Sequence, residues 1–275
     1  MYMRRFWGYF VAALGTLSSM TTLVAFIASP DKSNLPELCI FLYAIAIVII
    51  CVAYGWLMTK DKKKIDLYIH PKLSVIVKFD DLFSQKGVIV IPVNEYFDTI
   101  VDDKIIAHKT IHGIFIDTYF KNRLLELDSK ISSSLDGISF EPVIRKTGKQ
   151  KKYDLGICAD VEDGQNIYVL VAVTHFDEND KAFVSTEELR NVYMKLFEYL
   201  ENKANSRPVY LPLIGAGQSK VPKSPQRLLL FMLNCWEFFK CFSMPAGVNI
   251  ILHSSIRCKI NLLQIEEYYT NNLLK

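Results

Sequence analysis

Two long apolar runs near the N-terminus constrain this 275-residue chain more than any other feature. The first covers Trp7 to Ala28, the second covers Leu38 to Leu57, and neither contains a charged side chain. Each holds about 20 residues, the length that an α-helix needs to cross a hydrocarbon core of ~30 Å. A buried helical pair in a soluble protein would instead show polar faces. The runs therefore predict a transmembrane helical hairpin within residues 1–60.

A cleaved signal peptide is the alternative for the first run, and small residues such as Ser18 and Ala25 leave a cleavage site open. A signal peptide has an apolar stretch of only about 7–15 residues, however, and no second full-length run follows it. The hairpin is the better interpretation.

Basic residues set the expected orientation of the hairpin. They flank both runs on the same side: Arg4, Arg5, Lys60, Lys62, Lys63 and Lys64. The loop from Ser29 to Glu37 has no such excess. Because basic residues stay on the cytoplasmic side, we expect both termini in the cytoplasm and a multi-pass protein of the inner (cell) membrane.

The first apolar run also carries small residues four positions apart, at Gly8 and Ala12 and at Gly15 and Ser19. Such pairs let helix backbones approach closely. Two interpretations stay open, packing within the hairpin and self-association between chains into a homo-oligomer. Because no acid or base lies inside either run, a transporter or proton path is disfavoured.

The composition excludes several classes of function for the rest of the chain. The net charge is only +3, which gives no sign of a nucleic-acid partner. None of the six cysteines forms a CxxC pair, and the five histidines show no metal-binding spacing, so we predict no metal site and no disulfide framework. After a basic linker at 61–70, residues 71–275 have the size of one ordinary domain.

Strand-like and helix-like segments interleave in this domain. The expected strands are Leu73–Phe79, Gly87–Val93, Tyr153–Asp160, Asn166–Thr174, Pro208–Ile214 and Val248–His253. The expected helices are Phe115–Ile131, Ser185–Glu201, a helix from Ser224 to about Phe239, and Leu262–Asn271. The pattern predicts an α/β domain with helices on both faces of the sheet. Ligands of such sheets bind beyond the carboxyl ends of the strands.

Two loops that follow predicted strands carry candidate binding residues. The first contains Asp80 and Asp81, where a carboxylate can accept a hydrogen bond from an exocyclic amine; a solvated turn is the alternative. The second begins at Asn94, whose amide can bind a sugar hydroxyl, and continues through Asp102 to His112. A capping or core histidine is the alternative interpretation of His112.

The third loop is the most specific. Its candidate residues are Gly215, Ala216, Gly217, Gln218 and Lys220, between a strand and a helix that Ser224 caps. Glycines permit close backbone approach, and loop N–H groups can cradle a phosphate. The loop lacks the P-loop pattern, and a plain tight turn is the alternative. A lysine-rich segment, Arg145–Lys152, is either a solvated hairpin tip or a cover for an anionic ligand.

Taken in order, these loops resemble those of a macro domain, the ADP-ribose-binding α/β module. Asp80-Asp81-Leu82 resembles the family's Gly-Asp-Ile segment, which assigns the adenine contact to Asp81. Val93-Asn94 resembles the start of the Asn-rich loop that reaches the distal ribose, and Gly215–Gly217 resembles the second phosphate loop. The resemblance implies a macro-domain-like three-layer α/β/α fold with a mixed sheet, preceded by the hairpin.

The chain is more closely similar to the divergent macro domain of Thoeris antiphage effectors, some of which carry an N-terminal hairpin. This resemblance rests on Val93–Thr99, Lys109–Gly113 and Leu211–Gly217. It implies that a TIR-domain enzyme consumes NAD and makes an ADP-ribose conjugate, histidine-ADP-ribose, which the macro domain senses. Self-association of the effector then disrupts the membrane and kills or arrests the cell.

One departure from the family bears on catalysis. Hydrolytic macro domains carry a glycine triplet in the Asn-rich loop, whereas this chain reads Asp102-Asp103-Lys104-Ile105-Ile106. We therefore predict a ligand-sensing effector with no catalytic residue and no cofactor beyond the ADP-ribose-derived ligand. The alternative is a membrane-tethered ADP-ribosyl hydrolase that uses Asp102 or His112.

Overall fold

A computed structural model of the chain describes residues 2–28, 37–60, 62–70, 72–177, 181–204, 206–217, 223–238 and 243–273. The candidate residues Gln218 and Lys220, and nearly all of the loop between the two apolar runs, lie outside these ranges. The chain divides into two compact units, Met1–Asp61 and Lys62–Lys275, and each is described by itself.

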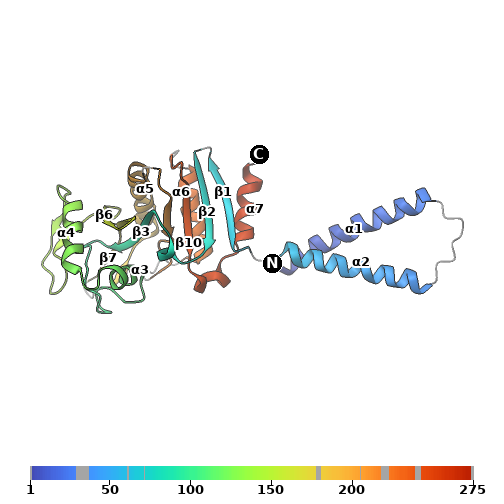
Figure 1. Cartoon of the computed structure of the whole chain (residues 1–275), viewed down its shortest axis with the longest axis horizontal. Coiled ribbons are helices and arrows are strands. Elements are labelled where there is room, and N and C mark those ends of the chain that lie inside the picture. Colours follow the sequence, from blue (N-terminus) through green and yellow to red (C-terminus); the bar gives the residue numbers. More distant parts are fainter. Residues whose placement is uncertain are drawn as a thin grey trace. The chain divides into compact units, whose positions relative to one another are not determined.

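The first unit is a pair of helices, α1 (Tyr2–Ala28) and α2 (Glu37–Met58) (Figure 1). They pack closely at Gly55, where an added Cβ would lie 3.1 Å from the Phe6 ring. Gly8 and Gly15 lie on another side of α1, because no atom lies within 4 Å of the Cβ position of either. The small residues at these two positions therefore do not mediate the contact with α2.

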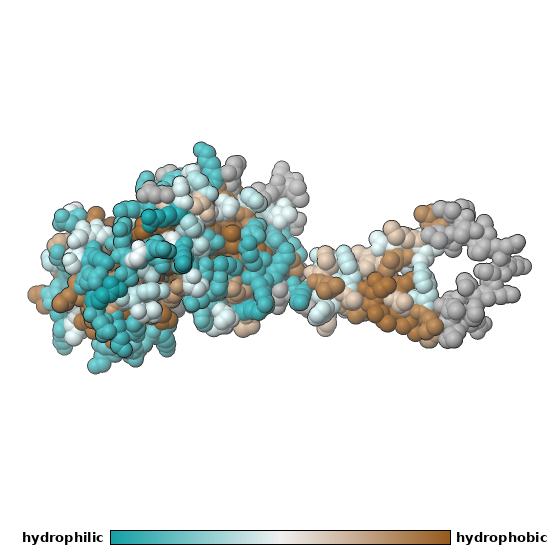
Figure 2. Space-filling model, viewed as in Figure 1, coloured by the Kyte–Doolittle hydropathy of each residue, from teal (hydrophilic) through white to brown (hydrophobic). Residues whose placement is uncertain are grey.

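Among the helices in the described residues, one is long and apolar enough to cross a membrane. It is the Phe41–Met58 part of α2, with a mean hydropathy of 2.4, and only 11% of it is buried. Helix α1 is less apolar, because several residues in its middle carry hydroxyl groups. Those of Thr16, Ser19 and Thr22 bond to carbonyls of their own helix. Figure 2 shows apolar residues gathered on the two helices.

The second unit contains one mixed sheet in the order β1-β2-β10-β9-β3-β7-β6, with β8 paired to β7. Its strands are β1 (Lys64–His70), β2 (Leu73–Phe79), β3 (Val88–Asn94), β6 (Cys158–Asp163), β7 (Asn166–Phe176), β8 (Ala182–Phe183), β9 (Val209–Pro212) and β10 (Val248–Leu252). Strands β2, β10, β9, β3 and β7 are parallel, whereas β1 and β6 run antiparallel to their neighbours. Strands β4 (Glu141–Pro142) and β5 (Lys151–Lys152) form a separate short hairpin.

Helices cover both faces of the sheet, as the three-layer prediction required. Alternate residues of each strand point to opposite faces. On one face, residues such as Val88 and Val90 pack under α5 (Thr186–Lys203), α6 (Pro225–Phe238) and α7 (Leu262–Leu273). On the other, Ile89 and Ile91 pack under α3 (Ile111–Phe115) and α4 (Leu124–Ser134).

Helix α5 begins where its sequence predicted. The Ser185 hydroxyl accepts a bond from the Glu188 amide, and the Glu188 carboxylate accepts one from the Ser185 amide, which completes a capping box. Leu189, Val192 and Leu196 then face the core. The turn between β6 and β7 has Gly164 at φ +61°.

Three segments differ from the sequence expectation. The strand expected over Tyr153–Asp160 begins later, because residues 153–157 form a turn and β6 covers Cys158–Asp163. The single helix expected over Phe115–Ile131 was wrong: the chain forms α3, a π-helical turn at Ile116–Phe120 and α4, with a break at Arg123, whose φ of −132° is not helical. The expected basic linker is also shorter. Lys64–His70 forms β1, because Ile65, Leu67 and Ile69 alternate with polar residues and face the core.

Candidate functional site

The carboxyl ends of the parallel strands bring the candidate loops to one edge of the sheet. Strand β2 ends before Asp80, β9 ends before Leu213 and β3 ends at Asn94. Because these strands are parallel, the three loops that follow them lie along the same edge. This is the edge at which open α/β sheets bind ligands.

Within this edge, β3 and β9 form the switch point of the sheet. Their pairing covers only Val88 with Val209 and Ile89 with Tyr210, although β3 continues to Asn94 and β9 continues to Pro212. The next parallel partner of β3 is β7 on one side, and that of β9 is β10 on the other. In open α/β sheets, ligands bind beyond the strand ends at such a point, and the Asn94 loop and the glycine loop follow the two strands that form it here.

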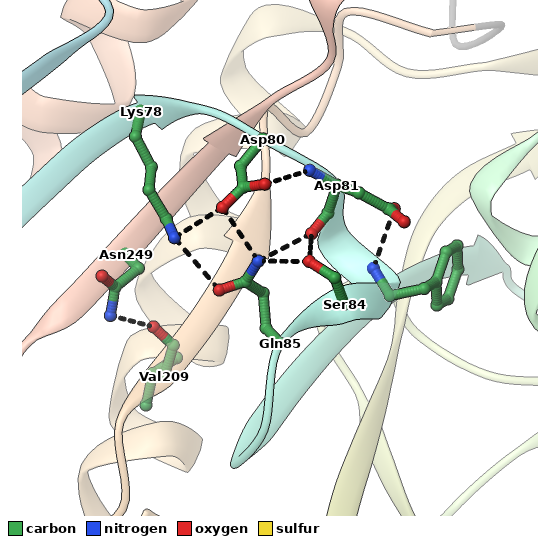
Figure 3. Close-up of polar contacts among 8 residues, drawn as sticks. Lys78, Asp80, Asp81, Ser84, Gln85, Val209 and Asn249 are labelled. Carbon is green, nitrogen blue, oxygen red and sulfur yellow. Dashed lines mark hydrogen bonds and ion pairs between the residues drawn. The ribbon is translucent and has the colours of Figure 1, made fainter.

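The Asp80–Asp81 loop is held by a closed set of hydrogen bonds (Figure 3). The Asp80 carboxylate accepts from Lys78 Nζ at 2.7 Å, from Gln85 Nε2 at 3.1 Å and from the Asp81 amide at 2.9 Å. The bond from Lys78 is the main reason that the pKa of Asp80 lies below its usual value. The exposed Asp81 side chain accepts from the Phe83 amide at 3.1 Å and caps the turn Leu82–Ser84.

Asn94 is buried, with 4% of its surface exposed, and its amide organises the loop that follows. The Asn94 oxygen accepts from the amides of Tyr96 at 3.0 Å and Asp98 at 3.3 Å, and the Asn94 nitrogen donates to the Asp98 carboxylate at 3.2 Å. Phe97 lies between them with φ +53°. The asparagine therefore sets the backbone of this loop from within.

The lysine-rich segment is fastened to the same loop. Arg145 forms an ion pair with Asp98 at 3.0 Å, and the Lys149 amide donates to Asp98 at 2.7 Å. The Arg145 guanidinium also stacks on the Tyr96 ring, 3.9 Å from its centroid. The segment is thus a fixed cover over the Asn94 loop, and a freely solvated hairpin tip is the wrong interpretation.

Asp102 and His112 occupy structural positions farther along the same loop. Burial raises the pKa of Asp102, but hydrogen bonds from the amides of Ile105 and Lys104 outweigh this effect and lower it. His112 is buried in α3, and burial, helped by the charge of Lys149, lowers its pKa to about 3. Its Nε2 atom has no hydrogen-bond partner within the described residues. The lowered pKa values make both groups weak bases.

The glycine loop begins directly after β9. Gly215 has φ +89°, and the Ile214 carbonyl before it accepts a bond from Tyr193 Oη at 2.8 Å, which ties the loop to α5. The Ala216 amide donates to the Leu213 carbonyl at 3.3 Å. Gly217 is exposed, and among the described residues no neighbouring atom lies within 4 Å of its Cβ position. The loop therefore presents open backbone at the switch point.

The sequence analysis missed a cluster of one histidine and two glutamates near the end of β7. His175, near the end of β7, contacts the buried Glu95 through Nδ1 and Glu188 through Nε2. The hydrogen bond that His175 donates to the Glu95 carboxylate raises the pKa of His175. No spacing signal could have found this group, because residues from three separate elements form it.

Two other features do not enlarge the site. A hollow of about 620 Å³ lies beside α4, β6 and α5, where Lys203 pairs with Asp160 at 2.5 Å, and not among the three loops. No group of His, Cys, Asp and Glu within the part of the chain that the structure describes is arranged to hold a metal ion.

Comparison with known proteins places the chain in a family. The family model described as "Thoeris protein ThsA, Macro domain" matches residues 75–253. The chain belongs to this ThsA macro-domain family. It is 29% identical over 266 residues to the Thoeris protein ThsA of Bacillus amyloliquefaciens (strain Y2), which covers 93% of this chain and 86% of that protein. The resemblance inferred from the three loops is thereby confirmed.

Solved structures show the fold of this ThsA-family chain. The Oceanobacillus iheyensis macrodomain with ADP aligns with a TM-score of 0.51 at 14% identity, over 77% of this chain and 96% of that one. A point variant of the same macrodomain with ADPR aligns with a TM-score of 0.50 at 14% identity, over 77% of this chain and 98% of that one. The macro-domain-like α/β fold is therefore confirmed.

Proposed function

We propose that this chain is a membrane effector of an antiphage defence system. Its macro domain senses an ADP-ribose derivative, for which we propose histidine-ADP-ribose, that a TIR-domain enzyme makes from NAD. Ligand binding favours a homo-oligomer of the full chain, and the clustered hairpins then disrupt the inner membrane.

The switch point between β3 and β9 is the observation that carries this proposal. The Asn94 loop lies on one side and Gly215–Gly217 on the other, and the Asp81 loop follows β2 along the same edge. Open backbone at Gly217 suits a phosphate, which backbone N–H groups bind well. Asp81 is the proposed adenine contact, and Asn94, Asp102 and His112 border the distal ribose. Gln218 and Lys220 complete the proposed set.

The hairpin is the part of the chain that disrupts the membrane in this proposal. Helix α2 is apolar and exposed, and α1 is the proposed second span with both termini in the cytoplasm. The Gly8 and Gly15 side of α1 has no neighbour within 4 Å of either Cβ position, so it is available to a second copy of the chain. Ligand shifts the equilibrium only if it binds the assembled state more tightly.

Calorimetric titration of the full chain with ADP-ribose and with histidine-ADP-ribose tests the first step. We expect the conjugate to bind and Gly217→Glu to abolish binding, because a carboxylate at this open position repels phosphate without a steric clash. Leu125→Glu is the matched control, since Leu125 is 88% exposed on α4 and gains the same charge away from the loops. Absence of binding to the wild type, or undiminished binding to Gly217→Glu, would refute the proposal.

A further inference from the structure

The link to the hairpin enters the second unit beside a candidate ligand loop. Strand β1 is antiparallel to β2, so its first residue, Lys64, pairs with Lys78 near the carboxyl end of β2. One residue earlier, the Lys63 carbonyl accepts a hydrogen bond from the Phe79 amide at 3.1 Å. On the other side of β2, the Asp80 amide donates to the Leu252 carbonyl of β10, also at 3.1 Å. Two consecutive amides therefore fasten the end of β2, one to the link and one to the sheet.

A balance of charge holds the first pair of β1 in place. Lys64 and Lys78 are directly opposite each other, and like charges at such positions are destabilising. Two carboxylates offset them, Asp66 at 3.1 Å from Lys64 and Asp80 at 2.7 Å from Lys78. Asp80 belongs to the candidate ligand loop shown in Figure 3. The Asp80 carboxylate thus accepts hydrogen bonds within the loop and also neutralises Lys78, which lies opposite the first residue of β1.

The link between hairpin and sheet is short. Helix α2 ends at Met58, Thr59 bonds back to the Gly55 carbonyl at 2.7 Å, and β1 begins at Lys64. Lys62 provides a further attachment, an ion pair with Glu266 of α7. Each residue freed from β1 would add about 3.3 Å of reach to this link. Loosening the first pair of β1 therefore changes how freely the hairpin can move and meet other copies.

We propose that the start of β1 is a latch, held by the Phe79–Lys63 hydrogen bond, and that a ligand at the Asp80–Asp81 loop releases it. A ligand amine or hydroxyl that takes the Asp80 carboxylate leaves Lys78 unbalanced opposite Lys64, and the repulsion opens the first pair. The latch rests on the proposed function, because it requires a nucleotide-like ligand at this loop. The coupling is reciprocal, so the ligand binds the released state more tightly.

Amide hydrogen exchange of the full chain in lipid nanodiscs, with and without ADP-ribose, tests the latch. Opening exposes the Phe79 amide but leaves the Asp80 amide bonded to β10. We expect ADP-ribose to speed exchange at Phe79 by about tenfold or more while Asp80 stays unchanged. Calorimetry on the same samples establishes separately whether ADP-ribose binds.

The matched variants are Lys64→Met, which removes the repulsion, and Lys64→Arg, which retains it. Lys64→Met should abolish the ligand-induced change at Phe79 and weaken ADP-ribose binding, whereas Lys64→Arg should keep both. Binding without a change at Phe79, or equal changes at Phe79 and Asp80, would overturn the latch and leave the proposed function standing. If only histidine-ADP-ribose binds, it replaces ADP-ribose in the exchange measurement. Absence of binding of both ligands would instead remove the proposed function and the latch with it.

Discussion

Asp98 and Arg145, 47 residues apart in the sequence, form an ion pair at 3.0 Å in which the Asp98 side chain has no exposed surface. Asp98 also accepts hydrogen bonds from Asn94 and from the Lys149 amide. This one carboxylate therefore joins the loop after β3 to the lysine-rich segment that covers it.

Replacing Asp98 should be strongly destabilising. Asp98→Ala leaves the Arg145 guanidinium nearly buried without this carboxylate, and loss of one partner of a buried pair costs about 3–5 kcal/mol. Unfolding of the full chain in urea measures the loss. Glu126→Ala, which breaks exposed ion pairs with Arg123 and Lys130, should cost far less, because solvent screens exposed pairs. Equal losses in the two variants would contradict the role given to Asp98.

Gly148 should tolerate no side chain. Its φ is +86°, and an added Cβ would lie 2.6 Å from the Asp98 carboxylate. Gly164 has a similar backbone, φ +61°, but open space around its Cβ position. Gly164→Ala should therefore lose only the roughly 1–2 kcal/mol of a left-handed residue, and Gly148→Ala should lose clearly more in the same unfolding assay. Similar losses of unfolding free energy in the two variants would show that the segment Arg145–Lys152 adjusts to a side chain at position 148.

Stability should depend on the charge of His175. Because Glu95 raises the folded-state pKa of His175 above the unfolded value of about 6.5, its contribution is complete below that value and is lost as the pH rises through the folded pKa. Measurement of the free energy of unfolding from neutral to mildly alkaline pH should show this decline in the wild type. His175→Gln should remove the decline, and an unaltered profile would exclude His175 as its source.

The open side of α1 should matter for toxicity and not for folding. Gly15→Leu adds bulk where no atom lies within 4 Å, so ligand binding and membrane insertion should survive while toxicity in cells that make the signal is lost. Gly55→Leu is the contrasting variant, because it disrupts the contact with Phe6 inside the hairpin. If toxicity survives both Gly15→Leu and deletion of the hairpin, the hairpin is only a tether.

Local sequence signals predicted the elements whose cause is local. Ser185 and Glu188 marked the start of α5, and the Val- and Ile-rich run Leu73–Phe79 predicted β2 with its bounds. The lysines around residue 62 led to the prediction of a linker in place of β1. The alternation of Ile65, Leu67 and Ile69 with polar residues already indicates a strand. The apolar spacing of Phe115–Ile131 continues across a break at Arg123 that only the backbone reveals.

The candidate site was predictable at the level of loops and not of side chains. Strand ends placed the Asp81, Asn94 and Gly215 loops at one edge, because parallel strands share a direction. The inward turn of Asn94 depends on Asp98, and the position of Asp98 depends on Arg145. Contacts of this kind arise from tertiary packing, which periodicity does not report.

The most direct test of the account is ligand-dependent leakage from dye-loaded vesicles that contain the full chain. Histidine-ADP-ribose should release the dye from vesicles with wild-type protein, and Gly217→Glu should abolish release although it inserts equally. Leu125→Glu should leak like the wild type. Leakage that is independent of ligand, or that persists in Gly217→Glu, would contradict the claim that the macro domain controls the hairpin.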